Sequence, residues 1–455
     1  MSQSVRAFTG FAIIAVLLAI VGVFQSWNVA LAIFNLCIIS AVMALGVNIQ
    51  WGYAGLFNVG IMGFAALGGV AAVLVSREPV QTAWEAGGGG ILASGLVLAL
   101  VIGFIIVIAK KLQSGWLKNF ILFIVVIGGY IAVRSVYDPA VDAIEADNPA
   151  KSGYLGGLGM PIIISWVIGG LFAAAVAWLI GKVALGLRSD YLAIATLGIS
   201  EILIAMMKNE DWLTRGVKNV TGLERPVPYE VDLQESARFV DWIEWFNAGK
   251  LAALSGDERA DALRQLTVEG SSLFVKLCYS GLFLAVLLII LTLCVLALAS
   301  PWGRMVRAIR DNEVSAAAMG KNITSRHLQI FVLGSAVVGI AGAMLTTLDG
   351  QFTPSSYQPL RFTFLIWVMV IVGGSGNNLG AVLGAFLIWF VWIEAEPVGN
   401  WFMSVLTSGM EEGSGLKKHL LDSAQHMRLF TMGIVMLLVM RFSPGGILPE
   451  RTARN

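Results

Sequence analysis

The chain has 455 residues, of which 57% are hydrophobic and 13% are charged, and its mean hydropathy is +0.80. This is more apolar surface than a soluble globular core buries, so the composition favours a membrane protein. The formal net charge of +1 argues against a nucleic-acid partner, which would need a basic surface.

Twelve apolar runs follow one another along the chain, and most approach the roughly 20 residues that a spanning helix needs. Because some are short or interrupted by glycine, we expect an all-α polytopic membrane protein with about 10–12 transmembrane or re-entrant helices. The first run is long for a signal peptide and a second follows at once, which favours a retained anchor. The runs lie near residues 7–25, 28–49, 53–76, 91–109, 118–134, 161–182, 187–208, 272–299, 329–349, 361–375, 378–396 and 427–442.

Basic residues near the ends of the runs predict how the chain is oriented in the membrane. One orientation puts all of the basic loops and both termini in the cytoplasm, and the acidic loops outside. The basic residues assigned to the cytoplasmic side are Arg6, Lys110, Lys111, Lys118, Lys182, Arg188, Arg304, Arg307, Arg310, Arg441, Arg451 and Arg454.

These patterns divide the chain into five segments. They are N-terminal transmembrane helices (1–208), an extracytoplasmic loop insert (209–271), one transmembrane helix (272–299), a cytoplasmic loop (300–328), and C-terminal transmembrane helices with a short cytoplasmic tail (329–455). In the insert, "ARFVDWIEWF" predicts an amphipathic helix that either rests on the membrane surface or packs within the insert. The stretch "DERADALRQL" predicts a second short helix.

Motifs for chemistry are absent from the sequence. It contains no G-x-x-x-x-G-K-[ST], H-E-x-x-H, C-x-x-C or G-x-S-x-G. Cys37, Cys278 and Cys294 fall within apolar runs, where small core residues are the expectation. The histidines, His327, His419 and His426, fall in or near loops and are expected at the surface. We therefore predict no catalytic residue, no metal and no cofactor.

Three features stand out as candidate functional residues. The stretches "WGYAGLFNVGIMGFAALGG" and "VGGSGNNLGAVLGA" combine glycine with asparagine, which favours either close helix packing or unwound segments. Glu201 lies within an apolar run, where a charge costs roughly 2.5–3.5 kcal/mol, so it should face protein or water. It either lines a solute path or only fixes packing. The candidate path residues are Gly55, Asn58, Gly198, Glu201, Gly374 and Asn377.

The third feature is the polar stretch 301–327. As one helix it would place Arg304, Arg307 and Asp311 on one side and apolar residues on the other. A plain amphipathic loop would look the same, but the small residues of "SAAAMG" also suit a helix that docks into a cleft of a partner.

The stretch "PWGRMVRAIRDNEVSAAAMGKN" resembles the cytoplasmic loop of ABC-importer permeases of the branched-chain amino acid (LivM-type) family. "ALGVNIQWGYAGLFNVGIMGFAALGG", "LRSDYLAIATLGISEI", "GIAGAM", "VGGSGNNLGAVLGA" and "RFSPGGILP" are similar to further motifs of that family, in the same order. Ile61 and Ser189 depart from the family pattern, and the regions 77–160, 224–271 and 400–426 are longer than expected. The residues of the stretch that match the family pattern are Pro301, Gly303, Arg304, Ala308, Ile309, Arg310, Glu313, Ala316 and Gly320.

The resemblance implies a permease subunit of an ATP-driven importer in the bacterial inner membrane. Its partners would be membrane lipid, a second LivH-type permease, two ABC ATPase subunits and an extracytoplasmic solute-binding protein. The solute would be a branched-chain amino acid, with urea or a short amide as alternatives; an ion-coupled secondary carrier is the competing class. The residues that would couple to the ATPases are Arg304, Arg307, Arg310, Glu313, Ala316, Ala317 and Gly320.

Overall fold

A computed structural model describes residues 3–147, 153–411 and 414–450, so Arg451 and Arg454 of the predicted tail lie outside the described residues. Within these ranges, nine helices are long and apolar enough to cross a membrane, or ten if the bent pair α19–α20 forms one span. The nine spans are α1 (Gln3–Phe24), α2 (Trp27–Val47) with η1 (Asn48–Gly52), α4 (Gln81–Ala83) with η2 (Trp84–Gly88) and α5 (Gly89–Lys111), α6 (Trp116–Ala146), α7 (Ile162–Ala184), α8 (Ser189–Asn209), α13 (Gly256–Ala299), α16 (Ile323–Asp349) and α18 (Asn378–Leu406).

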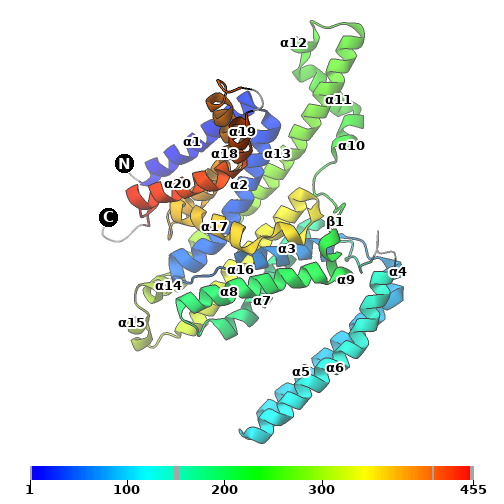
Figure 1. Cartoon of the computed structure of the whole chain (residues 1–455), viewed down its shortest axis with the longest axis vertical. Coiled ribbons are helices and arrows are strands. Elements are labelled where there is room, and N and C mark those ends of the chain that lie inside the picture. Colours follow the sequence, from blue (N-terminus) through cyan, green and yellow to red (C-terminus); the bar gives the residue numbers. More distant parts are fainter. Residues whose placement is uncertain (1–2, 148–152, 412–413, 451–455) are drawn as a thin grey trace.

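Two shorter apolar helices, α3 (Ile61–Ser76) and α17 (Pro359–Gly373), pack inside the same bundle. Each of the twelve predicted apolar runs contains one of these helices or α20, which confirms the all-α polytopic fold (Figure 1). The remaining elements are α9 (Asp211–Thr214), η3 (Gly216–Lys218), β1 (Val220–Thr221), α10 (Glu230–Glu235), α11 (Ala237–Phe246), α12 (Ala248–Leu251), α14 (Pro301–Asp311), α15 (Glu313–Ala318), β2 (Gln351–Phe352), η4 (Pro354–Ser356), α19 (Gly415–Ser423), η5 (Ala424–His426) and α20 (Met427–Phe442). The two-residue strands β1 and β2 pair antiparallel.

The centre of the bundle is α16, which packs against α2, α3 and α7. Small residues bring these backbones together. A Cβ on Gly68 of α3 would lie 1.9 Å from the carbonyl oxygen of Gly339, and one on Gly342 would lie 1.9 Å from the carbonyl oxygen of Ala65. Such close approach is how helices associate in lipid, where burial of apolar surface gives no advantage.

Both glycine–asparagine stretches contain breaks in helical structure, which is one of the two alternatives that the sequence left open. The first separates η1 from α3: residues 55–60 have no regular structure, and Gly55 has a φ of +71°. The second separates α17 from α18, with φ values of +119° at Gly374 and +79° at Gly376. The predicted continuous run 53–76 is therefore a turn followed by a short helix.

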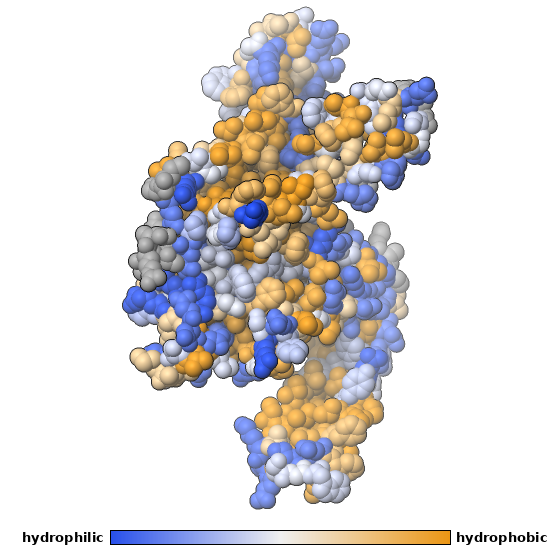
Figure 2. Space-filling model, turned by 60° about the vertical axis from the view of Figure 1, so that its left-hand side comes forward, coloured by the Kyte–Doolittle hydropathy of each residue, from blue (hydrophilic) through white to orange (hydrophobic). Residues whose placement is uncertain are grey.

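The α5–α6 hairpin projects away from the bundle (Figure 1). The two helices pack mainly against each other, and their apolar side chains are exposed on most sides. In Figure 2 this hairpin, at the bottom of the view, is orange along its length with blue near its end. Helices that are apolar all round, at this length, are suited to a lipid environment.

The insert lies at the N-terminal end of α13, a single helix of 44 residues. The prediction of a separate short helix at "DERADALRQL" is wrong, because these residues form the first turns of α13. The sequence predicts the end of the insert at residue 271 and the start of a transmembrane helix at 272. Because no proline interrupts 256–299, the helix continues across this boundary. The amphipathic helix α11 packs on α13: Phe239 and Ile243 are buried, and the rings of Phe239 and Phe274 are 5.9 Å apart. This favours packing within the insert over rest on the membrane surface.

We predict that Gly342→Val disrupts the α3–α16 contact, because the new side chain would overlap the carbonyl of Ala65. Overpacking costs about 1–3 kcal/mol, so the unfolding temperature in detergent should fall. Gly95→Val on α5 is the matched control, since a Cβ there meets no atom within 4 Å. Equal unfolding temperatures for the two variants would contradict this account of the packing.

Candidate coupling segment and translocation groove

The polar stretch 301–327 forms two short helices and not the single helix expected from the sequence. Asn312 separates α14 from α15 because it leaves the helical conformation (φ −159°, ψ 97°) and its side chain accepts a hydrogen bond from the amide of Ser315 at 2.9 Å. This is an N-cap, which starts a new helix. On α14, the buried residues Gly303, Val306 and Ile309 hold the helix against the bundle.

The small residues of α15 fall on two sides. Ala316 is buried, whereas Ala317 and Gly320 are exposed. Val314 and Met319 are also in the open, at 81% and 79% exposure. Together Val314, Ala317, Met319 and Gly320 form an exposed apolar surface, which we call the α15 face. Exposed apolar groups on a loop this polar are typical of a site of protein contact.

Two of the predicted coupling arginines cap the preceding span. Arg304 donates to the carbonyl of Ala299 at 3.1 Å, and Arg307 donates to the carbonyl of Leu298 at 3.2 Å. These carbonyls end α13 and have no partner within the helix, so cations there satisfy them and interact favourably with the helix dipole.

Arg310 points into the bundle instead. Its Nη1 donates to Glu450 at 2.9 Å and to the carbonyl of Gly52, and its Nη2 is 3.0 Å from Asp311. Burial lowers the pKa of the Arg310 guanidinium, but the hydrogen bond and charge of Glu450 outweigh it and the pKa is raised. Arg310 therefore links α14 to the first helix break and to the C-terminal tail.

Glu313, the remaining predicted coupling residue, is exposed at the start of α15. Its Oε1 lies 3.7 Å from Nε2 of His327 on α16. The expectation that His327 is a surface residue is wrong, since it is only 8% exposed beneath α15. Spacing alone could not show that α15 folds back over the first turn of α16.

The C-terminal tail is bound to the second helix break. The amides of Ile447 and Leu448 donate to the carbonyls of Val372 and Gly373, each at 2.9 Å. Asn377 caps α18 and donates to the carbonyl of Pro449 at 3.4 Å.

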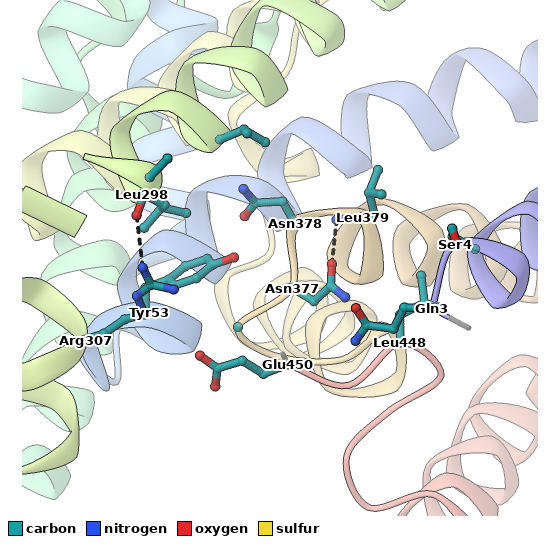
Figure 3. A pocket seen from close by; sticks show the side chains of 14 residues that line it. Gln3, Ser4, Tyr53, Leu298, Arg307, Asn377, Asn378, Leu379, Leu448 and Glu450 are labelled. Carbon is teal, nitrogen blue, oxygen red and sulfur yellow. Dashed lines mark hydrogen bonds between the residues drawn. The ribbon is translucent and has the colours of Figure 1, made fainter. Parts of the chain in front are cut away.

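Three of the segments predicted to be cytoplasmic, the N-terminus, the 300–328 loop and the C-terminal tail, thus meet at one end of the bundle. Gln3 of α1 also donates to the carbonyl of Pro449. Figure 3 shows Arg307, Tyr53, Asn377 and Glu450 around one cleft, of about 430 Å³.

A buried polar network fixes the first break, and Asn58 is the one member that the sequence analysis names as a candidate path residue. Asn58 is 2% exposed and donates to Gln50 at 2.9 Å, and Gln50 donates to Ser335 at 3.1 Å and to the carbonyl of Phe331 at 2.9 Å. Asn48 joins the two breaks, because it donates to Asn378 at 3.0 Å and accepts from the amide of Gly376 at 2.9 Å. The signal in the sequence was the pair of amides in "GVNIQWG", inside an apolar run.

Glu201 lies elsewhere, on the open face of α8. It is exposed. A Cβ on Gly198, one turn earlier on the same face, would meet no atom within 4 Å. This face borders a groove of about 1140 Å³ formed with α17, α18 and α20. The groove holds four more charged groups, some of them paired: Arg428 is 2.6 Å from Glu396, and Arg361 stacks over Trp392 at 5.0 Å. The charged residues that line the groove are Glu201, Lys208, Arg361, Glu396 and Arg428.

The six predicted path residues therefore do not form one site. Glu201 and Gly198 share the groove face, whereas Asn58 is buried in the polar network. Gly55, Gly374 and Asn377 belong to the two turns near the tail.

The sequence profile of a transporter family described as "Branched-chain amino acid transport system / permease component" matches residues 29–440. The chain belongs to this permease family.

Individual relatives of the permease are distant. The "High-affinity branched-chain amino acid transport system permease protein LivM" of Escherichia coli (strain K12) is 26% identical over 284 residues, 62% of this chain and only 56% of that relative's length. The "Probable branched-chain amino acid transport permease protein LivM" of Methanocaldococcus jannaschii is 23% identical over 368 residues, 81% of this chain and 88% of the relative. The "Xylose transport system permease protein XylH" of E. coli (strain K12) is 30% identical over 117 residues, 24% of this chain and 30% of the relative. No solved structure matches the permease.

We predict that Arg310→Ala in this permease frees the tail and lowers the free energy of unfolding by about 1–3 kcal/mol, because Glu450 loses a charged partner. Limited proteolysis within 443–450 should become faster. Arg304→Ala is the control, since Arg304 is exposed and donates to one carbonyl. If both variants are cleaved at the wild-type rate, Arg310 does not hold the tail.

Proposed function

We propose that this chain is a membrane-spanning subunit of an ATP-driven importer in the bacterial inner membrane, and that its solute is a branched-chain amino acid. The printed names of the LivM relatives support the solute class. The sequence holds no G-x-x-x-x-G-K-[ST] motif, so ATP would be hydrolysed by two partner ABC ATPase subunits. Urea or a short amide is the alternative solute.

The observation that carries the proposal is the α15 face. Val314, Ala317 and Met319 stand in the open at the end of the bundle where the basic residues gather, which the positive-inside pattern assigns to the cytoplasm together with both termini. A cleft in an ATPase would accept these apolar side chains of small to medium size. Arg310 would transmit the movement of α14 to the first helix break and to the tail, because it bonds to both.

The solute path would follow the groove beside Glu201. An ionised carboxylate facing lipid costs roughly 2.5–3.5 kcal/mol, and the groove carries four further charges. A second, related permease subunit covering the groove would keep these groups in water or in polar contact. An extracytoplasmic solute-binding protein would deliver the solute at the opposite end, where the insert lies.

We predict that Val314→Asp lowers the amount of ATPase that co-purifies with the permease at least tenfold, because it puts a charge on the apolar α15 face. Thermal unfolding of the permease itself should not change, since Val314 is 81% exposed.

Val217→Asp is the matched control, because Val217 is 64% exposed in η3, at the other end of α8. It should leave co-purification unchanged. Wild-type recovery of the ATPase with Val314→Asp would remove α15 as the docking site.

We predict that Glu201→Gln, measured as ATP-driven leucine uptake in vesicles containing the assembled transporter, lowers uptake severalfold without loss of subunits. The amide keeps the shape and removes the charge. Normal uptake would mean that Glu201 does not act in the path. Accumulation of leucine by the chain alone, with an ion gradient and no ATPase, would favour the secondary-carrier alternative.

A further inference from the structure

The cleft in Figure 3 lies where six parts of the chain meet: the start of α1, the turn after η1, the end of α13, α14, the second helix break and the tail. Its volume of about 430 Å³ falls in the range of about 300–1,000 Å³ typical of ligand sites. In Figure 3, Arg307 and Tyr53 lie on one side of the cleft, Asn377 on the other, and Glu450 between them. The cleft shares no lining residue with the groove of Glu201.

One wall of the cleft is apolar and reaches the outside of the bundle. Val295 and Leu298 lie one turn apart near the end of α13, and Ala7 of α1 and Leu379 of α18 complete the wall. Val295 is 51% exposed and Leu379 is 44% exposed. The flanking helices α1 and α13 are both spans that pack on α2, so this wall opens toward lipid. It is suited to the acyl chain of a lipid.

Two opposite charges line the polar end of the cleft without pairing with each other. Arg307 donates only to the carbonyl of Leu298, so most of its guanidinium N–H groups have no partner among the described residues. Glu450 accepts from Arg310 at Oε2, and its Oε1 has no partner in the same ranges. Both charges nevertheless act on the phenol of Tyr53, which is 7% exposed in this cleft. The cleft therefore presents a cation and an anion near each other, each able to make a further bond.

These charges restrict which ligand fits. Inorganic phosphate would pair with Arg307 but be repelled by Glu450, and a simple amine would pair with Glu450 but be repelled by Arg307. A phospholipid with a glycerol headgroup has no cation for Glu450. A headgroup that carries a phosphate and a primary ammonium, joined by two carbons, satisfies both side chains, and its acyl chains account for the apolar wall.

We propose that the cleft binds one phosphatidylethanolamine molecule from the leaflet that the positive-inside pattern assigns to the cytoplasm. Its phosphate accepts from Arg307, its ammonium donates to Oε1 of Glu450, and an acyl chain lies along Val295 and Leu298. Hydrogen bonds between charged groups are roughly twice as strong as neutral ones. Because Arg307 belongs to α14 and Glu450 to the tail, the headgroup bridges these two segments, as Arg310 does. The site does not depend on the identity of the transported solute.

The test is native mass spectrometry of the full chain, delipidated in detergent and titrated with three phospholipids that have identical acyl chains. They are phosphatidylethanolamine, phosphatidylcholine, whose ammonium has no N–H to donate, and phosphatidylglycerol, which has no ammonium. Phosphatidylethanolamine should be retained at least fivefold more than either of the others. Glycerophosphoethanolamine, the headgroup without acyl chains, should not displace it at equal concentration. Equal retention of the three lipids, no retention, or displacement by the free headgroup would overturn the proposal.

Variants of the two charged residues locate the headgroup. Arg307→Gln should lower retention of phosphatidylethanolamine at least fivefold. Arg304→Gln is the matched control, because Arg304 also donates to one carbonyl at the end of α13 but does not line the cleft, and it should retain the lipid as the wild type does. Glu450→Gln should remove the preference for phosphatidylethanolamine over phosphatidylglycerol. Equal retention in the two arginine variants, or an unchanged preference in Glu450→Gln, would overturn the assignment.

A second pair of variants tests the apolar wall. Val295→Trp places an indole against the wall and should lower retention of all three lipids. Leu293→Trp is its control, since Leu293 is 60% exposed on the same helix and lies outside the cleft. Both positions are exposed, so this pair still decides if Arg307→Gln does not fold. Equal retention in the two tryptophan variants would show that no lipid lies along α13 here.

A bound headgroup should also hold the tail. Addition of phosphatidylethanolamine should slow limited proteolysis within 443–450 in the wild type and in Arg304→Gln. It should not do so in Arg307→Gln, because the headgroup then lacks its bond to α14. A cleavage rate in the wild type that is the same with and without the lipid would overturn the bridge between α14 and the tail.

Discussion

The structure depends on one constraint: within lipid, every polar group of an interrupted helix must find its partner inside the protein. The two breaks in the bundle meet this constraint together, because Asn48 bonds to the backbone and side chain of the second break while Gln50 and Asn58 fix the first. Trp367 of α17 adds a bond to the carbonyl of Asn58 at 3.1 Å. The two breaks are therefore tied to each other, and the first is also tied to α16 and α17, so neither should rearrange alone.

This pairing explains why α14 and the C-terminal tail converge on the two breaks. Just before the first break, the carbonyl of Gly52 accepts a hydrogen bond from Arg310. At the second break, backbone carbonyls accept hydrogen bonds from the amides of the tail. The α14 helix is thus attached to both breaks through a few hydrogen bonds, while the α15 face remains free. The importer proposed above requires this division: one surface for a partner, and a separate set of bonds that connects this surface to the interrupted helices.

Hydropathy predicts the positions of the spans well, because twenty apolar residues have few alternatives to crossing a membrane. Glycine with asparagine leaves close packing and unwound segments open, and the structure contains both: close packing at Gly68 and breaks at Gly55 and Gly374. The sequence could not show which groups pair, because the partners are remote: Gln50 bonds to a carbonyl 281 residues later, and Arg310 to a carboxylate 140 residues later. For the same reason the sequence wrongly predicts His327 at the surface. It also wrongly predicts a separate short helix in the first turns of α13, because the polar residues there do not reveal that the helix continues.

The continuity of α13 has a mechanical consequence. At 1.5 Å per residue its 44 residues form a rod of about 66 Å, and Ser300 alone separates it from α14. The N-terminal end of this rod carries the insert, and the carbonyls at its C-terminal end are capped by Arg304 and Arg307 of α14. A load applied at either face of the membrane therefore acts on the same stiff body, and tilting one end must displace the other.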